Sequence, residues 1–209
     1  MPLTTQEIEK RLYTDRDLIV SPILDREKQI SNGAVDIRLG QHFIALRSTN
    51  LVALNPADVH AQRQVGQAQV RVYIPFGQYI VLQPNTIVLG TALEFVGLPN
   101  DLHASVITRS SYGRLGLTIA TAVSVHAGYK GCLTLELVNH GKTAIQLSPG
   151  CRIGHLEFSQ LSSADRKPYS ALGDGAKYVY PTLPEFSKIH EEHSELEMFA
   201  QIGKAIAGC

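Results

Sequence analysis

Residues 109–114, Arg-Ser-Ser-Tyr-Gly-Arg, place two guanidinium groups and two hydroxyl groups within one short segment. Arginine offers paired N–H donors that match phosphate oxygens, and the serine hydroxyls add short hydrogen bonds. The backbone amides of a turn that contains glycine supply further donors to an anion. The segment lacks the Gly-Lys-Ser/Thr of a Walker loop. These residue types favour a phosphate-binding turn, and the alternative is a polar turn that only connects two strands.

Glu136 is a second candidate because of its place in the sequence GCLTLELVN, residues 131–139. In a strand, Leu133, Leu135 and Leu137 point to one face and Glu136 to the other. Small and apolar neighbours would raise the pKa of this carboxyl group and suit it to proton transfer. The strand pattern by itself favours the simpler alternative, a glutamate on a solvated sheet face.

The sequence contains only the first half of the motif that zinc-dependent deaminases share. Residues 155–157 and 193–195 read His-x-Glu, the first half of the zinc deaminase pattern. The second half, Pro-Cys-x-x-Cys, is missing, since Cys151 precedes the first pair and Cys209 is the only cysteine after either. The sequence therefore predicts no zinc and no other metal held by the protein itself.

The composition limits the classes of partner. The chain has 209 residues, of which 44% are hydrophobic, and its formal net charge is +0. This balance argues against binding to nucleic acid or to an anionic membrane. The first residues lack the apolar run of a signal peptide, and no stretch reaches membrane-spanning length. Three cysteines without paired spacing indicate a reducing compartment. We expect a cytoplasmic protein with a single domain, residues 1–209.

The candidate turn and Glu136 fall within residues 30–161, a region of short β-rich runs. In AVDIRLG, residues 34–40, apolar and polar side chains alternate as in a strand with one buried face. Similar runs follow, separated by Gly, Pro and Asn. Helical periodicity is absent between about residues 30 and 160, and residues 48–68 form a polar excursion. The pattern predicts an all-β core, either a barrel, a sandwich or a jelly roll.

The N-terminal segment, residues 1–29, is expected to contain a short helix. Thr4 and Glu7 match a capping box, and Ile8 and Leu12 follow at helical spacing.

The C-terminal arm, residues 162–209, is expected to end in an amphipathic helix over about 184–207. Thr182 and Glu185 match a second capping box, and apolar residues follow at spacings of three, four and seven. The apolar stripe of this helix must cover either its own barrel or a neighbouring subunit.

Three longer segments together resemble the dCTP deaminase family of the dUTPase-like superfamily. They are RSSYGRLGL (109–117), GYKGCLTLELVNHG (128–141) and PGCRIGHLEF (149–158). SNGAVDIRLGQHF resembles an early strand of that family, and PY and AKY resemble its arm; the resemblance extends from about residue 4 to 190. It implies a distorted all-β jelly roll or barrel, a homotrimer with active sites at subunit interfaces, and no zinc.

The resemblance assigns the turn to the triphosphate of a nucleotide. The residues that would contact phosphate oxygens are Arg109, Ser110, Ser111 and Arg114, the last of them from the neighbouring subunit. The arm residues that would close over the nucleotide are Tyr169, Lys177 and Tyr178. Mg²⁺ would arrive with the triphosphate rather than bind to a dedicated protein site.

The resemblance also places Glu136 on the catalytic glutamate of the family. Deamination needs a water to attack C4 of cytosine, a proton to reach N3, and ammonia to leave. One carboxylate held close to the base can carry these protons. Ser110 and the main-chain carbonyl of Ala122 match the positions that orient the water.

The sequence departs from the family pattern at three positions. Thr108 replaces a glycine before the turn. His126 stands where an aspartate meets the deoxyribose 3′-hydroxyl and, in dUTPase-like members, supports pyrophosphate chemistry. Pro181 lies where the arm usually carries a glutamine near the phosphates. A histidine still forms a hydrogen bond with a hydroxyl, so His126 remains a predicted sugar contact.

These observations leave three functions, of which the first is favoured. It is the hydrolytic deamination of dCTP to dUTP and ammonia. The second is a bifunctional deaminase that forms dUMP, or a deaminase of another cytosine nucleotide; the missing aspartate argues against the bifunctional form. The third is a non-catalytic nucleotide-binding relative, which predicts the loss of Glu136 or of the RSS cluster, and both are present.

Overall fold

The structure is a computed structural model of the whole chain. It describes residues 1–55, 58, 60–120, 124–164, 167, 169–171, 177–192, 198–199 and 201–202. The chain divides into two compact units. Unit 1 comprises Met1–Ile44 and Val72–Glu185, and unit 2 comprises Ala45–Arg71 and Phe186–Cys209.

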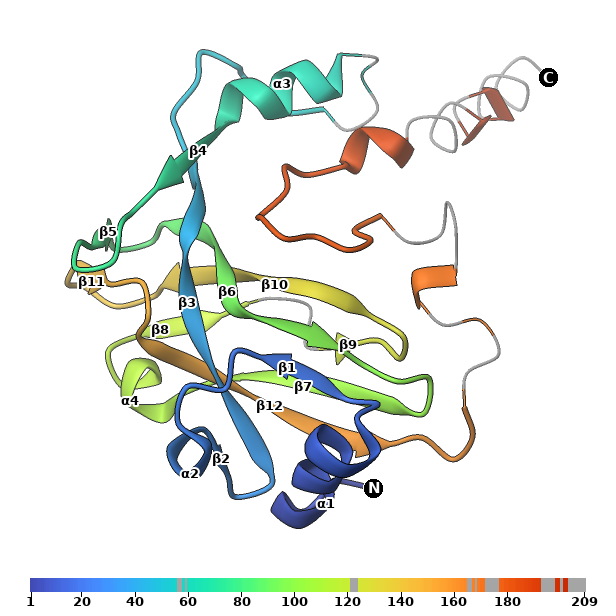
Figure 1. Ribbon diagram of the computed structural model, residues 1–209. Helices are drawn as coiled ribbons and strands as arrows, with labels where there is room; N and C mark the ends of the chain where they lie inside the picture. The colour runs from blue at the N-terminus through green and yellow to red at the C-terminus, as the bar shows by residue number, and fades with distance from the viewer. Residues whose placement is uncertain are drawn as a thin grey trace. The chain divides into compact units, whose positions relative to one another are not determined.

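A ten-stranded sheet dominates the described part of the chain (Figure 1). Its main path runs β8-β10-β6-β3-β12-β7-β9, and β1, β2 and β4 pair with strands of this path. The bounds along the path are β8 Leu117–Ile119, β10 Lys130–Asn139, β6 Ile87–Gly97, β3 Ala34–Leu46, β12 Arg152–Gln160, β7 Leu102–Thr108 and β9 Ser124–Val125. The side strands are β1 Ile19–Ser21, β2 Ile30–Ser31 and β4 Gln69–Tyr73. A separate two-stranded sheet joins β5 (Ile80–Leu82) to β11 (Ile145–Leu147).

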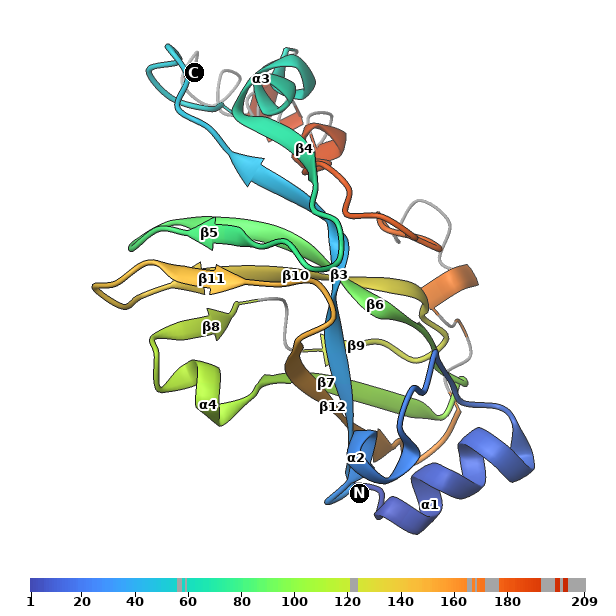
Figure 2. The ribbon, with the colours of Figure 1, turned by 60° about the vertical axis from the view of Figure 1, so that its left-hand side comes forward.

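The large sheet is curled into a half-barrel. Figure 2 shows β3 crossing between the β6–β10 part and the β7–β12 part of the sheet. Side chains alternate as the sequence predicts: Val35, Ile37 and Leu39 are fully buried on β3, and the leucines of β10 are buried between half-buried neighbours. Burying these alternate residues from both parts of one curled sheet creates a single apolar core. The predicted all-β fold is confirmed.

The N-terminal helix also forms as predicted. In α1 (Thr5–Glu9) the Thr4 hydroxyl accepts a hydrogen bond from the Glu7 amide, and the Glu7 carboxylate accepts one from the Thr4 amide. The helix continues as the π-helix η1 (Lys10–Asp15). A short α2 (Arg26–Gln29) follows β1. No helix of the described residues combines the length and the apolar character needed to cross a membrane.

The expectation of no helix between residues 30 and 160 is wrong at α3 (Ala61–Ala68) in unit 2 and at the single-turn helix α4 (Ser110–Gly113) in unit 1. Ala61 and Val65 lie one turn apart and are both buried. The Asp58 carboxylate accepts hydrogen bonds from the His60 amide and the Gln64 side chain, which stabilise the start of this helix. The apolar spacing is present in the sequence but covers only two turns.

The second capping box does not begin a helix. The chain has no regular structure between Thr182 and Lys188, and the 3₁₀ helix η4 starts at Ile189 and ends at Glu192. The Cys132 amide donates to the Pro181 carbonyl at 2.6 Å, which holds this part of the arm beside β10. That approach requires a glycine at 131, since a Cβ atom there would lie 2.5 Å from Pro181 Cδ. Farther along, Met198, Phe199, Gln201 and Ile202 are helical; the rest of the expected helix lies outside the described residues.

A buried polar network joins the first strands of unit 1. Glu94 on β6 is fully buried, and its carboxylate accepts hydrogen bonds from the Arg38 amide at 2.7 Å and from the Arg38 guanidinium and the Gln29 amide nitrogen at 3.1 Å. Arg38 Nη1 also donates to Gln29 Oε1 at 2.6 Å. Burial raises the pKa of Glu94, and the hydrogen bonds from Arg38 oppose that shift.

Candidate active site

The Arg-Ser-Ser turn begins where β7 ends. Arg109 has extended backbone geometry, and Ser110–Gly113 form the single-turn helix α4. The Arg114 amide donates to the Ser110 carbonyl at 3.0 Å and closes the turn. The side chains of Ser110, Ser111 and Arg114 are exposed. The turn therefore presents its hydroxyl and guanidinium groups to solvent, as an anion-binding turn requires.

Thr108 ties the two ends of the turn together. Its hydroxyl accepts a hydrogen bond from the Ile119 amide of β8 at 2.8 Å. At the far end, Gly116 has a φ of +89°, and a Cβ atom there would lie 2.6 Å from the Gly141 nitrogen. A glycine is needed at this position for both reasons. Before the turn, Thr108 is held by β8, and after it, Gly116 packs against Gly141 in the segment that follows β10.

Glu136 lies beside β8, the strand that leaves the turn. Leu137 pairs with Ile119, and the Ala120 amide donates to the Glu136 carbonyl at 2.7 Å. The Glu136 side chain is half-buried on the face of β10 opposite the core leucines. This burial raises the pKa of Glu136, so its carboxylate is a stronger base than an exposed glutamate.

Arg109 forms an ion pair that the sequence did not indicate. Its Nη1 donates to Asp36 Oδ2 at 2.9 Å, and Arg152 Nη1 donates to the same oxygen at 3.1 Å. Asp36 is the polar position between Val35 and Ile37 on β3, and Arg152 opens β12. The alternation of β3 places Asp36 away from the core, but only the strand order brings it next to the end of β7.

A second group gathers around His126. The imidazole of His126 stacks on the Tyr169 ring with centroids 5.9 Å apart and planes 14° apart. Tyr169 is also tilted against Tyr129, and its amide donates to the Ala127 carbonyl at 2.9 Å. The Tyr178 amide donates to the Tyr169 hydroxyl at 3.3 Å. The predicted sugar contact and two of the three predicted arm residues therefore lie together.

The dCTP deaminase-like family matches residues 2–161, most of the chain. A Halorubrum lacusprofundi protein named dCTP deaminase is 38% identical over 205 residues, 96% of this chain and 98% of that protein. The chain belongs to the dCTP deaminase-like family. A Halobacterium salinarum family member named dCTP deaminase, dUMP-forming, is 37% identical over 192 residues, 90% of this chain and 95% of that one.

A solved structure in the same family shares the fold. The crystal structure of 2′-deoxycytidine 5′-triphosphate deaminase from Agrobacterium tumefaciens matches with a TM-score of 0.57 at 24% identity. The match covers 75% of this chain and 46% of that chain. At this identity the match supports the fold of the curled sheet alone.

The remaining predicted residues are placed as follows. Lys177 is half-buried next to Tyr178 in the arm. Ala122, whose carbonyl is predicted to orient the water, lies outside the described residues. The first His-x-Glu pair lies on β12, where His155 Nε2 is 3.7 Å from Glu157 Oε1. Within the described ranges, no three His, Cys, Asp or Glu side chains gather as metal ligands.

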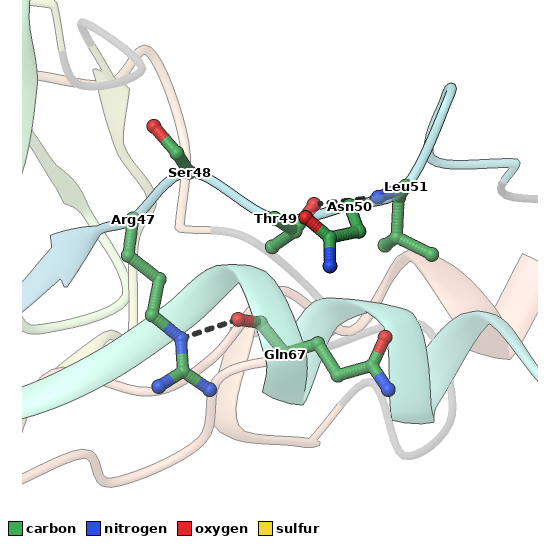
Figure 3. A pocket seen from close by; sticks show the side chains of 6 residues that line it. All are labelled: Arg47, Ser48, Thr49, Asn50, Leu51 and Gln67. Atoms are coloured by element: carbon green, nitrogen blue, oxygen red, sulfur yellow. Dashed lines mark hydrogen bonds between the residues drawn. The ribbon is translucent and has the colours of Figure 1, made fainter.

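A pocket of about 380 Å³ lies in unit 2 and contains none of the predicted site residues (Figure 3). It is lined by Arg47, Ser48, Thr49, Asn50, Leu51 and Gln67. Arg47 Nε donates to the Gln67 carbonyl near the end of α3, so this guanidinium is used to hold the helix. The candidate site of this family member is therefore the turn, Glu136 and the His126 group in unit 1.

Proposed function

We propose that this protein is an enzyme that hydrolyses dCTP to dUTP and ammonia. The observation that carries the proposal is the position of Glu136, whose half-buried carboxyl group has a raised pKa and whose strand is joined through β8 to the Arg-Ser-Ser turn. Membership of a family with relatives named dCTP deaminase, which match along nearly their whole length, supports the same substrate. The proposed turn would bind the triphosphate of a nucleotide, and the carboxylate on a neighbouring strand would act on its base.

In the proposed reaction, Glu136 takes a proton from a water molecule, and the resulting hydroxide attacks C4 of cytosine. The same carboxylic acid then delivers that proton to N3. A second proton passes from the new C4 hydroxyl through Glu136 to the amino group, which leaves as ammonia and yields the uracil carbonyl. The raised pKa of Glu136 suits both transfers, since the group must accept and return a proton near neutral pH. Ser110 and the Ala122 carbonyl would orient the water, and no zinc takes part.

The triphosphate would be held by the turn. Arg109 and Arg114 supply charge-assisted hydrogen bonds, and Ser110 and Ser111 supply hydroxyl donors. Tyr169, Lys177 and Tyr178 would close the arm over the nucleotide. Mg²⁺ would enter as part of the substrate, bound to the phosphates.

We also propose that the protein is a cytoplasmic homotrimer in which Arg114 reaches the site of a neighbouring subunit. Several large apolar side chains of unit 1 are more than half exposed, among them Tyr73 and Phe76 at 55% each, and a subunit contact would cover such groups. Multi-angle light scattering on the active enzyme tests the assembly, and an active monomer would contradict it.

The decisive experiment incubates the purified protein with dCTP and Mg²⁺ while ammonia and pyrophosphate are both followed. Ammonia without pyrophosphate supports the proposed reaction. Ammonia with pyrophosphate indicates formation of dUMP, as the name of the Halobacterium salinarum relative states for that protein. Nucleotide binding without either product indicates a non-catalytic relative. CTP in a parallel reaction tests for another cytosine nucleotide.

A further inference from the structure

We infer that Asp36 is a positioning residue that holds the Arg109 guanidinium ready for the triphosphate. The inference rests on the proposed function, because it assumes that Arg109 binds phosphate. It adds a residue from β3, far from the turn in sequence, to the substrate-binding apparatus.

The sheet itself brings Asp36 to Arg109. On β12, His155 pairs with Asp36 of β3 on one side and with Ile107 of β7 on the other. Directly paired residues share one face of a sheet, and so do residues two positions apart. The Arg109 side chain therefore starts on the face that carries Asp36, and its Nη1 reaches Asp36 Oδ2 at 2.9 Å.

The surroundings make this ion pair stronger than an ordinary surface pair. The Asp36 side chain is 18% exposed and that of Arg109 is 31% exposed, so water screens their attraction only in part. Arg152 donates to the same Asp36 oxygen at 3.1 Å and also to the Lys28 carbonyl at 3.1 Å. Arg152 thereby also holds the carboxylate in place.

Asp36, Arg109 and Arg152 together still attract phosphate. Asp36 carries one negative charge against the two positive charges of Arg109 and Arg152, so the three groups together remain positive. A guanidinium has five N–H donors, and Arg109 uses one of them for its hydrogen bond to Asp36. A free arginine would lose much side-chain freedom on binding phosphate, whereas a guanidinium already held by Asp36 loses less. Asp36 is therefore expected to improve binding despite its negative charge.

The test compares Asp36→Asn with Glu157→Gln. Both changes remove one negative charge from the same face of the sheet, but within the described part of the chain Glu157 pairs with His155, whereas Arg109 and Arg152 pair with Asp36. We expect Asp36→Asn to raise the KM for dCTP, and the inhibition constant of inorganic tripolyphosphate, roughly tenfold. The kcat should change by less than about twofold, since Asp36 does not touch the base. Glu157→Gln should leave both binding constants unchanged or slightly improved.

A double-mutant cycle separates positioning from a merely structural role. If Asp36 acts through Arg109, adding Asp36→Asn to Arg109→Ala causes no further loss of tripolyphosphate affinity. Losses that add, or an Asp36→Asn enzyme that binds dCTP as well as the parent or better, overturn the inference and leave the proposed deaminase intact. A parent protein that neither binds dCTP nor releases ammonia overturns both.

Discussion

The rings of His126 and Tyr169 are stacked, with centroids 5.9 Å apart and planes inclined by 14°. The contact joins the turn after β9 to the 3₁₀ helix η2 (Tyr169–Ala171) of the C-terminal arm. It is supported by the hydrogen bond from the Tyr169 amide to the Ala127 carbonyl. The residue predicted to contact the sugar is therefore also the residue on which Tyr169 of the arm packs.

Two substitutions at His126 separate sugar recognition from arm docking. His126→Phe keeps an aromatic ring for Tyr169 but loses both ring nitrogens, and His126→Asp restores a strong acceptor for a sugar hydroxyl while removing the stack. If His126 contacts the 3′-hydroxyl, the Asp variant should increase the preference for dCTP over 2′,3′-dideoxycytidine triphosphate, which lacks that hydroxyl, by a factor of about ten. The ratio of kcat/KM values for the two nucleotides measures this preference. A ratio that stays constant in both variants means that His126 serves only to dock the arm.

Arg109→Ala and Arg114→Ala should weaken binding of dCTP far more than binding of deoxycytidine. Each change removes charge-assisted hydrogen bonds to phosphate, worth about 1.5–3 kcal/mol. Calorimetric titration with the nucleotide and the nucleoside measures the difference. Arg47→Ala is a suitable control, since Arg47 is an exposed arginine of unit 2 that holds α3. Equal losses for nucleoside and triphosphate would show that the turn is only structural.

Glu136→Gln should abolish turnover and preserve nucleotide binding. Glutamine keeps the shape of the side chain but cannot carry the proton between water, N3 and the leaving amine. Ammonia release measures turnover, and equilibrium titration with dCTP measures binding. Turnover at the rate of the parent enzyme would remove Glu136 from the mechanism.

The same variant should unfold at a higher temperature than the parent at neutral pH. Burial raises the pKa of Glu136 in the folded state, so the neutral carboxyl group is favoured by folding. Its contribution to stability is complete below the ordinary pKa of glutamate and is lost as the pH rises through the raised folded value. Thermal melts from pH 7 towards pH 4 should therefore show the advantage of glutamine shrinking. An advantage that grows on acidification contradicts the direction of the shift.

Much of the fold could be predicted because its strands bury one face. Alternation in AVDIRLG and GCLTLELVN predicts which apolar side chains enter the core. The structure confirms this for Val35, Ile37 and Leu39 and for the leucines of β10, although Arg38 is buried as well. The capping box of α1 is likewise a local interaction between Thr4 and Glu7. The segment after Thr182 carries the same local pattern without forming a helix, and just before it the Pro181 carbonyl accepts a hydrogen bond from Cys132 of β10.

The site was less accessible to sequence reasoning, because its contacts depend on strand order. The turn and Glu136 have recognisable residue types, but the pair of Asp36 with Arg109 exists only because β12 lies between β3 and β7. The stack of His126 on Tyr169 similarly joins two segments whose sequences show no helix or strand pattern, so the contact could not be predicted from them. The buried ion pair of Arg38 and Glu94 could not be predicted either, since alternation places Arg38 on the outer face of its strand.

Arg38→Met should destabilise the protein by about 3–5 kcal/mol, because it leaves the fully buried Glu94 without its charged partner. Urea unfolding measures this loss. Lys28→Met removes the partner of Asp25 in an exposed pair and should cause a much smaller loss of stability than Arg38→Met.

The pH dependence of the Arg38→Met variant tests the cause of its instability. The pKa of Glu94 is already raised by burial, and the loss of Arg38 raises it further. With the folded pKa above the unfolded one, the contribution of Glu94 is present at low pH and lost as the pH rises. The deficit of the variant should therefore be largest at neutral pH and shrink on acidification. The double variant Arg38→Met/Glu94→Leu should recover much of the stability, since it replaces the pair by apolar groups. A double variant as unstable as Arg38→Met alone would mean that lost packing, rather than the unpaired carboxylate, causes the deficit.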